Sequence, residues 1–217
     1  MERFWFILAA FLGLALQAVP ASADIVYTLK CSTAACGGST TYGTVTLSTP
    51  VNLTSVHVSV QLTSNYRFGG NNTDAFLWNG LTNDTLVVSN VTGGGFDSGN
   101  IANGNHEASV FTSGSNNEFD YLIQRSNNTG APTSLSFDVT KSGGLTLANF
   151  ATDNDGNGFF FAAQIRTTSS NDLFYVASNT AGVKVPEPGT WTLSIAGMAG
   201  LAGLVMLQRR RKWARVA

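Results

Sequence analysis

The chain has 217 residues, and its 12 Lys and Arg side chains nearly balance its 13 Asp and Glu side chains. This balance hides a division, because residues 24–185 hold six basic and eleven acidic side chains, a net charge of −5. A mildly acidic body of this kind argues against nucleic acid and anionic membrane surfaces as partners.

Residues 1–23 are predicted to form a secretory signal peptide. Met1, Glu2 and Arg3 form a short n-region, and the apolar stretch Phe4–Leu16 has the length expected of the hydrophobic region of such a signal. Small residues at Ala21 and Ala23 occupy the two positions that signal peptidase reads, so cleavage is expected before Asp24. The alternative is an N-terminal anchor that is not cleaved.

Residues 24–184 are predicted to form one exported domain built of strands. Val56–Leu62 and Leu135–Val139 alternate apolar and polar residues, as strands with one buried face do. Further apolar runs that fit strands less cleanly are Ile25–Leu29, Thr44–Leu47, Phe76–Trp78, Leu86–Ser89, Ser109–Phe111, Phe119–Gln124, Leu145–Phe150, Phe159–Ile165 and Leu173–Ala177. The Gly- and Asn-rich segments between them are typical of turns, and Thr92–Asn117 is expected to be a long loop with one or two weak strands. We therefore expect an all-β fold, an antiparallel β-sandwich that is jelly-roll-like.

The two cysteines, Cys31 and Cys36, lie close together in a chain that the signal peptide directs to an oxidising compartment. A local disulfide between them is the favoured interpretation. A metal pair would need further ligands, and a reactive thiol is the remaining alternative.

One segment resembles the first half of a calcium-binding loop. Asp153, Asp155 and Asn157 stand at the first, third and fifth loop positions, and a glycine follows at the sixth. The twelfth position is Gln164 rather than the usual Glu, and the intervening residues favour a strand. Calcium is therefore the one cofactor considered, and a Gly-rich turn between two strands is the preferred interpretation.

Histidine is scarce, which limits the catalytic possibilities. His57 lies on the polar side of a predicted strand and is interpreted as a solvated side chain. His106 could join Glu107, Glu118 and Asp120 in a hydrolytic site, if the fold brought them together. The sequence contains no nucleophile elbow, no zinc-protease motif and no P-loop, so we expect a protein that is not an enzyme.

Exposed aromatic side chains on a sandwich would favour carbohydrate binding, because their faces stack on sugar rings. The candidates are Phe76–Trp78, Tyr66 and Phe96. Packing in the core is the alternative, and the many Phe residues favour it.

The tail has three parts in a fixed order. Pro186, Glu187 and Pro188 predict an extended and accessible segment, because each proline disfavours helix. Residues 190–207 carry no charge and are just long enough for a transmembrane helix, with Trp191 at one interface and Leu207 at the other end. The basic stop sequence consists of Arg209, Arg210, Arg211 and Lys212. By the positive-inside rule, residues 208–217 are expected to form a cytoplasmic tail.

Residues 185–212 closely resemble the PEP-CTERM sorting signal of Gram-negative bacteria. The resemblance implies export through the inner membrane, temporary retention by the helix, and processing near Pro186–Glu187–Pro188 by an exosortase. It also implies delivery to the cell surface or extracellular matrix in cells that make exopolysaccharide, which is then a candidate partner. Signal peptidase and exosortase are the implied processing enzymes, and a plain anchor that is never processed is the alternative.

Three functions follow as hypotheses for the exported domain. The leading one is a non-enzymatic structural or adhesive role in exopolysaccharide or biofilm. A carbohydrate-binding module is the second, and a secreted hydrolase built around His106 is the third.

Overall fold

The computed structural model describes residues 23–32, 39–49, 54–69, 73–79, 86–107, 118–125, 130, 132–147, 158–170, 172–185, 197 and 200. The chain divides into two compact units, Asp24–Val185 and a second unit made of Met1–Ala23 and Pro186–Ala217. The first unit begins at the residue predicted to follow the signal peptide and ends one residue beyond the predicted domain boundary. Among the described residues, no helix is long and apolar enough to cross a membrane.

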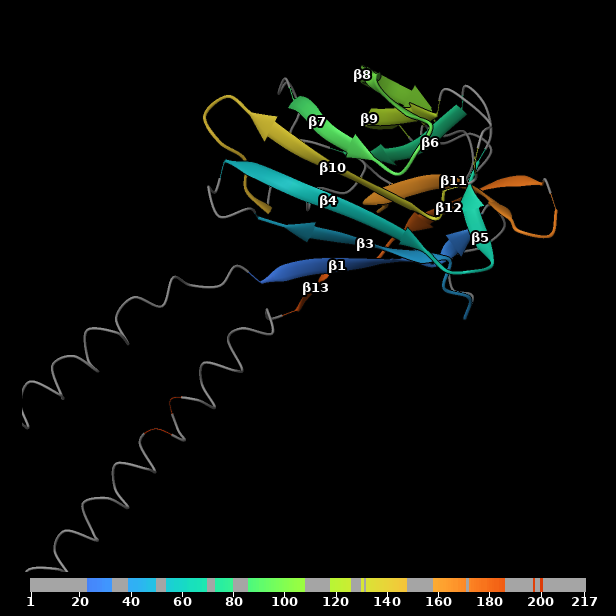
Figure 1. The fold of residues 1–217 in the computed structure, drawn as a ribbon, viewed down its shortest axis with the longest axis horizontal. Coiled ribbons are helices and arrows are strands. Elements are labelled where there is room, and N and C mark those ends of the chain that lie inside the picture. The colour runs from blue at the N-terminus through green and yellow to red at the C-terminus, as the bar shows by residue number, and fades with distance from the viewer. Residues whose placement is uncertain are drawn as a thin grey trace, which may run out of the picture. The chain divides into compact units, whose positions relative to one another are not determined.

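The described residues of Asp24–Val185 lie mostly in β-strands, which are arranged in two antiparallel sheets. The six-stranded sheet has the order β13 (Val183–Val185), β1 (Asp24–Leu29), β3 (Gly43–Ser48), β4 (Ser55–Leu62), β10 (Ser134–Lys141) and β7 (Leu86–Thr92). Figure 1 shows β1, β3, β4 and β10 side by side, with β11 and β12 in a second layer.

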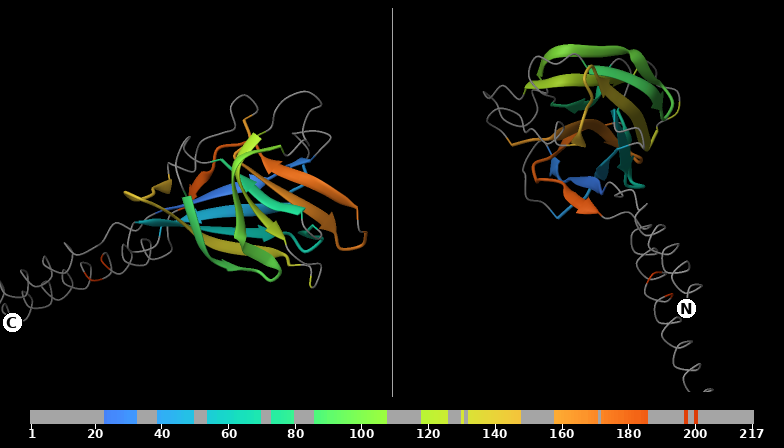
Figure 2. Two further views of the ribbon diagram at one scale, coloured as in Figure 1. Left: turned by 90° about the horizontal axis from the view of Figure 1, so that it is seen from above. Right: turned by 90° about the vertical axis from the view of Figure 1, so that its left-hand side faces the viewer.

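The seven-stranded sheet has the order β2 (Cys31–Ser32), β12 (Leu173–Ser178), β11 (Phe161–Thr167), β6 (Thr73–Trp78), β9 (Glu118–Arg125) and β8 (Phe96–Glu107). The remaining strand, β5 (Tyr66–Phe68), also pairs with β11. The strands of both sheets twist, as the two further views in Figure 2 show.

The main core lies between the two sheets and is filled by alternate residues of their strands. On β4, Val56, Val58 and Val60 are fully buried, while the residues between them are partly exposed. β10 buries Phe137 in the same way, and Phe76 of the opposite sheet packs against it with ring centroids 6.0 Å apart. β-branched and aromatic residues at every second position are what a half-buried strand requires, so the predictions for β4 and β10 are confirmed.

A second, smaller core lies on the other face of the seven-stranded sheet. It contains Leu77, Leu122, Ala162 and Ala177, which alternate with residues of the main core along β6, β9, β11 and β12. The central strands of this sheet are thus buried on both faces. This explains why Phe76–Trp78 and Phe161–Ala163 are continuous apolar runs rather than alternating ones.

Some expected elements differ from the structure. Within the predicted strand Leu145–Phe150, the described residues 145–147 are not in a strand, because the chain leaves β10 through a turn with positive φ at Gly143 and Gly144. β8 is a twelve-residue strand within the segment expected to be mostly loop. The short strands β2, β5 and β13 have no predicted counterpart in the sequence. The predicted strand at 109–111 lies outside the described residues.

Candidate functional site

Many of the predicted site residues fall outside the described part of the chain. These are Ala21, Cys36, Asp153, Asp155, Asn157, Pro186, Glu187, Pro188, Trp191, Leu207, Arg209, Arg210, Arg211 and Lys212. Of the predicted membrane segment 190–207, only Gly197 and Gly200 are described. The sorting motif, the basic stop and the calcium loop therefore stay predictions.

The two ends of the β-domain are paired with each other. Asp24 is the first residue of β1, Val185 is the last residue of β13, and the two are register partners in an antiparallel ladder. Ile25 pairs with Lys184, and Val26 pairs with Val183. The chain thus enters and leaves the domain at the same end of one sheet edge.

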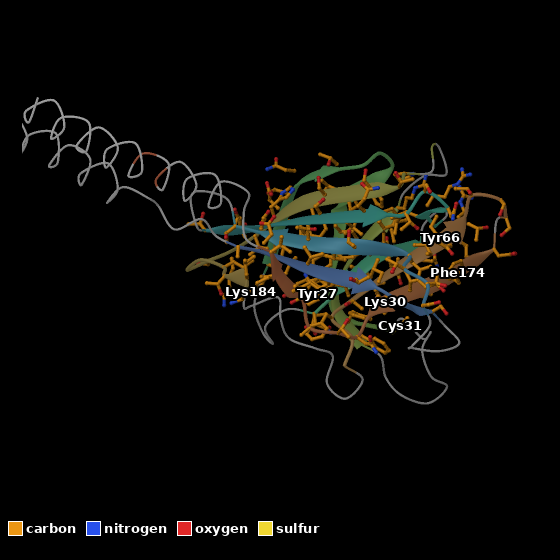
Figure 3. The ribbon with its side chains drawn as sticks, turned by 90° about the horizontal axis from the view of Figure 1, so that it is seen from below. Tyr27, Lys30, Cys31, Tyr66, Phe174 and Lys184 are labelled. Carbon is orange, nitrogen blue, oxygen red and sulfur yellow. The ribbon has the colours of Figure 1, made fainter. Side chains whose placement is uncertain are left out.

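Cys31 lies on the two-residue strand β2, where it is fully buried and disulfide-bonded. β2 pairs with β12 through Cys31 and Ala177, and the backbone N–H of Lys30 donates to the Ala177 carbonyl at 3.0 Å. Figure 3 shows Cys31 directly after Lys30, at the end of β1. Cys31 therefore lies where the chain crosses from β1 of the six-stranded sheet to β2 of the seven-stranded sheet.

A polar network crosses three strands on the outer face of the six-stranded sheet. His57 of β4 and Asp138 of β10 are register partners, and His57 Nδ1 lies 2.6 Å from Asp138 Oδ1. Asn90 of β7 donates from Nδ2 to the other carboxylate oxygen at 2.7 Å. Asn90 adopts a positive φ of 54°, a conformation that asparagine tolerates better than most residues do. His57 is 39% exposed, so its ring remains open to solvent.

The network sets the charge state of Asp138. Partial burial acts to raise the pKa of this carboxyl, but the hydrogen bonds from Asn90 and His57 and the charge of His57 outweigh it. The pKa of Asp138 therefore lies below its ordinary value, and the group is an ionised acceptor at neutral pH. Because an ionised carboxylate can only accept, His57 Nδ1 carries the proton, which leaves Nε2 directed away from this bond. His57 is thus oriented by a carboxylate, and the interpretation as a purely solvated side chain is corrected.

The structure brings together part of the acidic group considered for a hydrolase. Glu107 of β8 and Glu118 of β9 are register partners, and His106 pairs with Phe119 beside them. Asp120 follows on β9, where its backbone N–H donates to Oδ1 of the buried Asn79 at 3.2 Å. The backbones of Glu107 and Glu118 are therefore adjacent.

The aromatic candidates for sugar stacking are mostly core residues. Phe76, Leu77 and Trp78 are fully buried, so they cannot form an exposed strip. Phe96 is partly buried against Phe68, with ring centroids 5.2 Å apart. Core packing, the interpretation that the many Phe residues favoured, is therefore confirmed for Phe76–Trp78, and Phe96 also packs against the core.

Tyr66 belongs to a partly buried trio with Tyr42 and Phe174. The ring centroids of Tyr66 lie 5.0 Å from Tyr42 and 6.1 Å from Phe174, and all the contacts are edge-to-face. Figure 3 shows Tyr66 and Phe174 side by side at one end of the domain. The rings cover each other's edges, so the trio closes this end of the core.

Arg125 is a fully buried charged residue that was not among the predicted site residues. Its guanidinium donates to the backbone carbonyls of Phe68, Gly69 and Gly130, with the Gly69 bond at 2.7 Å. Burial, and then the charge of Arg166, lower the pKa of Arg125. The side chain holds together the segments that follow β5 and precede β10. The one available signal was an arginine directly after the apolar run of β9.

Among the described residues, no three His, Cys, Asp or Glu side chains are grouped closely enough to hold a metal ion. No family model, curated protein or solved structure matches the chain.

Proposed function

We propose that this chain is an exported surface or matrix protein whose β-domain is delivered by the N-terminal signal and sorted by the PEP-CTERM-like tail. Signal peptidase would cleave before Asp24, and an exosortase would act near Pro186–Glu187–Pro188. The pairing of Asp24 with Val185 carries the proposal, because the folded domain begins and ends at the two predicted processing sites.

The pairing of Asp24 with Val185 supports the predicted membrane topology. Both hydrophobic segments are expected to cross the same membrane with the body outside, and both junctions leave the domain at one end of one sheet edge. Cleavage at both sites would also leave the ladder between β1 and β13 complete. The processed product would be the whole sandwich and little else.

For the domain itself we infer a non-enzymatic structural or adhesive role in exopolysaccharide or biofilm. A sandwich with one large core and a second apolar cluster suits a stable module in an extracellular matrix. We take its connectivity to be jelly-roll-like, and the signal and membrane segments to be helical. The carbohydrate-binding alternative no longer rests on Phe76–Trp78, and the hydrolase alternative rests on the neighbouring backbones of Glu107 and Glu118.

Intact-mass analysis of the protein from its native host, with and without the exosortase, tests the sorting proposal. We expect an N-terminus at Asp24 in both strains, and loss of the segment after the Pro-Glu-Pro motif only when the enzyme is present. A matched variant, Glu187→Gln, should reduce processing while leaving the signal-peptide cleavage unchanged. An identical C-terminus in both strains would reduce the tail to a plain anchor.

A further inference from the structure

The first and last strands of the β-domain differ in how firmly they are held. β1 is paired with β13 on one side and with β3 on the other, and it buries Ile25, Tyr27 and Leu29 in the main core. Among the described strands, β13 pairs with β1 alone, so it forms the edge of the six-stranded sheet (Figure 1). All three of its residues are exposed, Val183 at 66% and Val185 at 44%. β13 can therefore detach without removing a side chain from the core, whereas β1 cannot.

β13 is anchored to β1 at the residue that precedes it. A Cβ atom at Gly182 would overlap Cγ2 of Ile25 and would lie 2.7 Å from the ring of Tyr27, so the backbone of Gly182 packs directly on β1. Beyond this contact, three register pairs hold the strand. A short edge strand with no buried side chain lies at the low end of local stability, and it opens far more readily than the centre of a sheet. Gly182 thus marks the point up to which β13 can leave β1 and pair with it again.

The predicted processing motif begins at the residue that follows β13. Proteins that bind an extended peptide do so through its main-chain hydrogen bonds, with pockets for alternate side chains. An enzyme that acts near Pro186–Glu187–Pro188 would take the preceding residues Val183–Val185 into its groove in this way. In the folded domain the same residues are paired with β1. The pairing and the enzyme therefore compete for one stretch of chain.

We propose that β13 is a detachable strand, which leaves β1 so that the processing enzyme can bind Val183–Val185 on a domain that has already folded. The partner is an enzyme whose groove receives an extended chain with two valines at alternate positions and Lys184 between them. This inference rests on the sorting part of the proposed function. It adds that the structure of the domain controls access to the cleavage site.

The competing mechanism is that the enzyme pairs with the free edge of β13 and leaves the strand in place. Two features of the edge disfavour it. β13 has three residues, and the middle one is Lys184, which is exposed. Short edge strands and edge lysines both hinder the addition of a further strand. The two mechanisms differ in one respect that can be measured, because only detachment requires β13 to separate from β1.

A disulfide between the two strands tests the proposal in the full-length protein in its native host. Val26→Cys/Val183→Cys places cysteines at register partners that are partly exposed and exposed, so no core residue is lost. Directly opposite residues of paired strands lie close enough for such a bridge. Intact masses at intervals after induction, with peptide mapping without reduction, give the rate at which linked chains lose the C-terminal segment. We expect this rate to fall at least about ten-fold, because the linked strand cannot open.

Dithiothreitol in the medium should restore processing of the double variant. The single variants Val26→Cys and Val183→Cys are the matched controls, and they should be processed as the unaltered protein is, with or without the reductant. Gly182→Ala, which crowds the anchor, should be processed at least as fast as the unaltered protein. An N-terminus at Asp24 in every variant shows that export is intact.

Processing of linked chains at the rate of the single variants would overturn the proposal and favour strand addition. Slow processing of the double variant that the reductant does not relieve would overturn it as well, since a different defect would then be responsible. Failure of a different kind is recognised in the unaltered protein. If that protein keeps its C-terminal segment in the strain that has the exosortase, the sorting proposal itself is wrong, and this inference falls with it.

Discussion

His57 Nδ1 lies 2.6 Å from Asp138 Oδ1, although 81 residues separate the two in the sequence. The antiparallel pairing of β4 with β10 places them opposite each other. Because the pKa of Asp138 is lowered in the folded protein, ionised Asp138 stabilises the fold.

The Asp138→Asn variant should therefore change the acid stability. In the unaltered protein the contribution of Asp138 is present above the ordinary carboxyl pKa of about 3.9 and is lost as the pH falls toward the lower folded value. The variant lacks this dependence, and at pH 7 it should be less stable by roughly 1 kcal/mol or less, since the pair is partly solvated. Urea unfolding followed by near-ultraviolet circular dichroism at pH 7 and pH 3 measures both effects. Equal acid sensitivity in the two proteins would contradict the assigned role.

Replacing Arg125 by Met should be strongly destabilising. The change keeps much of the buried side-chain volume but leaves the carbonyls of Phe68, Gly69 and Gly130 without their donor. We expect a loss of about 3 kcal/mol in the free energy of unfolding. Arg67→Met is the matched control, because Arg67 donates to the Thr168 carbonyl near the surface and should cost less than about 1 kcal/mol. Similar unfolding midpoints for the two variants would count against a structural role for Arg125.

Tyr175 should limit stability at alkaline pH. Burial, and then the charge of Asp74, raise its pKa to about 12, while a hydrogen bond with Gln164 opposes the shift. A phenol with a raised folded pKa costs nothing below the ordinary value near 10, and it favours unfolding as the pH rises from there toward 12. Tyr175→Phe should therefore lose less stability between pH 9 and pH 11.5 than the unaltered protein. Ultraviolet titration of tyrosinate checks the pKa itself, and a normal titration of every tyrosine would remove the basis of this prediction.

The disulfide of Cys31 should join it to Cys36. Peptide mapping without reduction should recover the two cysteines in one linked fragment. Replacing both by Ala should cost about 2 kcal/mol, as expected for a short closed loop. Isolation of a free Cys36 thiol, or of a chain linked to a second copy through Cys31, would show that the pairing is wrong.

Gly182→Ala should loosen β13. A Cβ atom there would overlap Cγ2 of Ile25 and would lie 2.7 Å from the ring of Tyr27, both on the neighbouring strand β1. Hydrogen exchange at Val183–Val185 should therefore become faster. Gly143→Ala is a useful comparison, because its positive φ makes it costly while its Cβ would meet no neighbour. Faster exchange at β13 in both variants alike would point to general destabilisation instead.

Local patterns in the sequence predicted a large part of the fold. Alternation along Val56–Leu62 and Leu135–Val139 identified β4 and β10, because one face of each is buried and the other is polar. The same alternation rule could not predict the burial of Phe76–Trp78, because this central strand is covered on both faces and has no polar side. Only one or two weak strands were predicted within Thr92–Asn117, and the full length of β8 could not be predicted because its pairing with β9, rather than an apolar alternation of its own, defines it.

The polar features were harder to predict, because they depend on which strands are neighbours. Nothing near His57 in the sequence indicates Asp138 or Asn90, which come from β10 and β7. Thr46 and Ser59 belong to separate strands, and in the sequence each looks like an ordinary polar position of its own strand. Their grouping became visible only once the register between β3 and β4 was known.

The pairing of Asp24 with Val185 also determines how the domain responds to force. A pull on the two ends of an antiparallel pair, applied where the ends lie side by side, breaks the hydrogen bonds one after another. Only three register pairs join β13 to β1, so a domain still held by both tails would begin to open at low load. Once one tail has been removed, a pull on the remaining tail no longer acts on β1 and β13 together at their adjacent ends. Processing would then change a weak mechanical link into a stronger one without altering the fold.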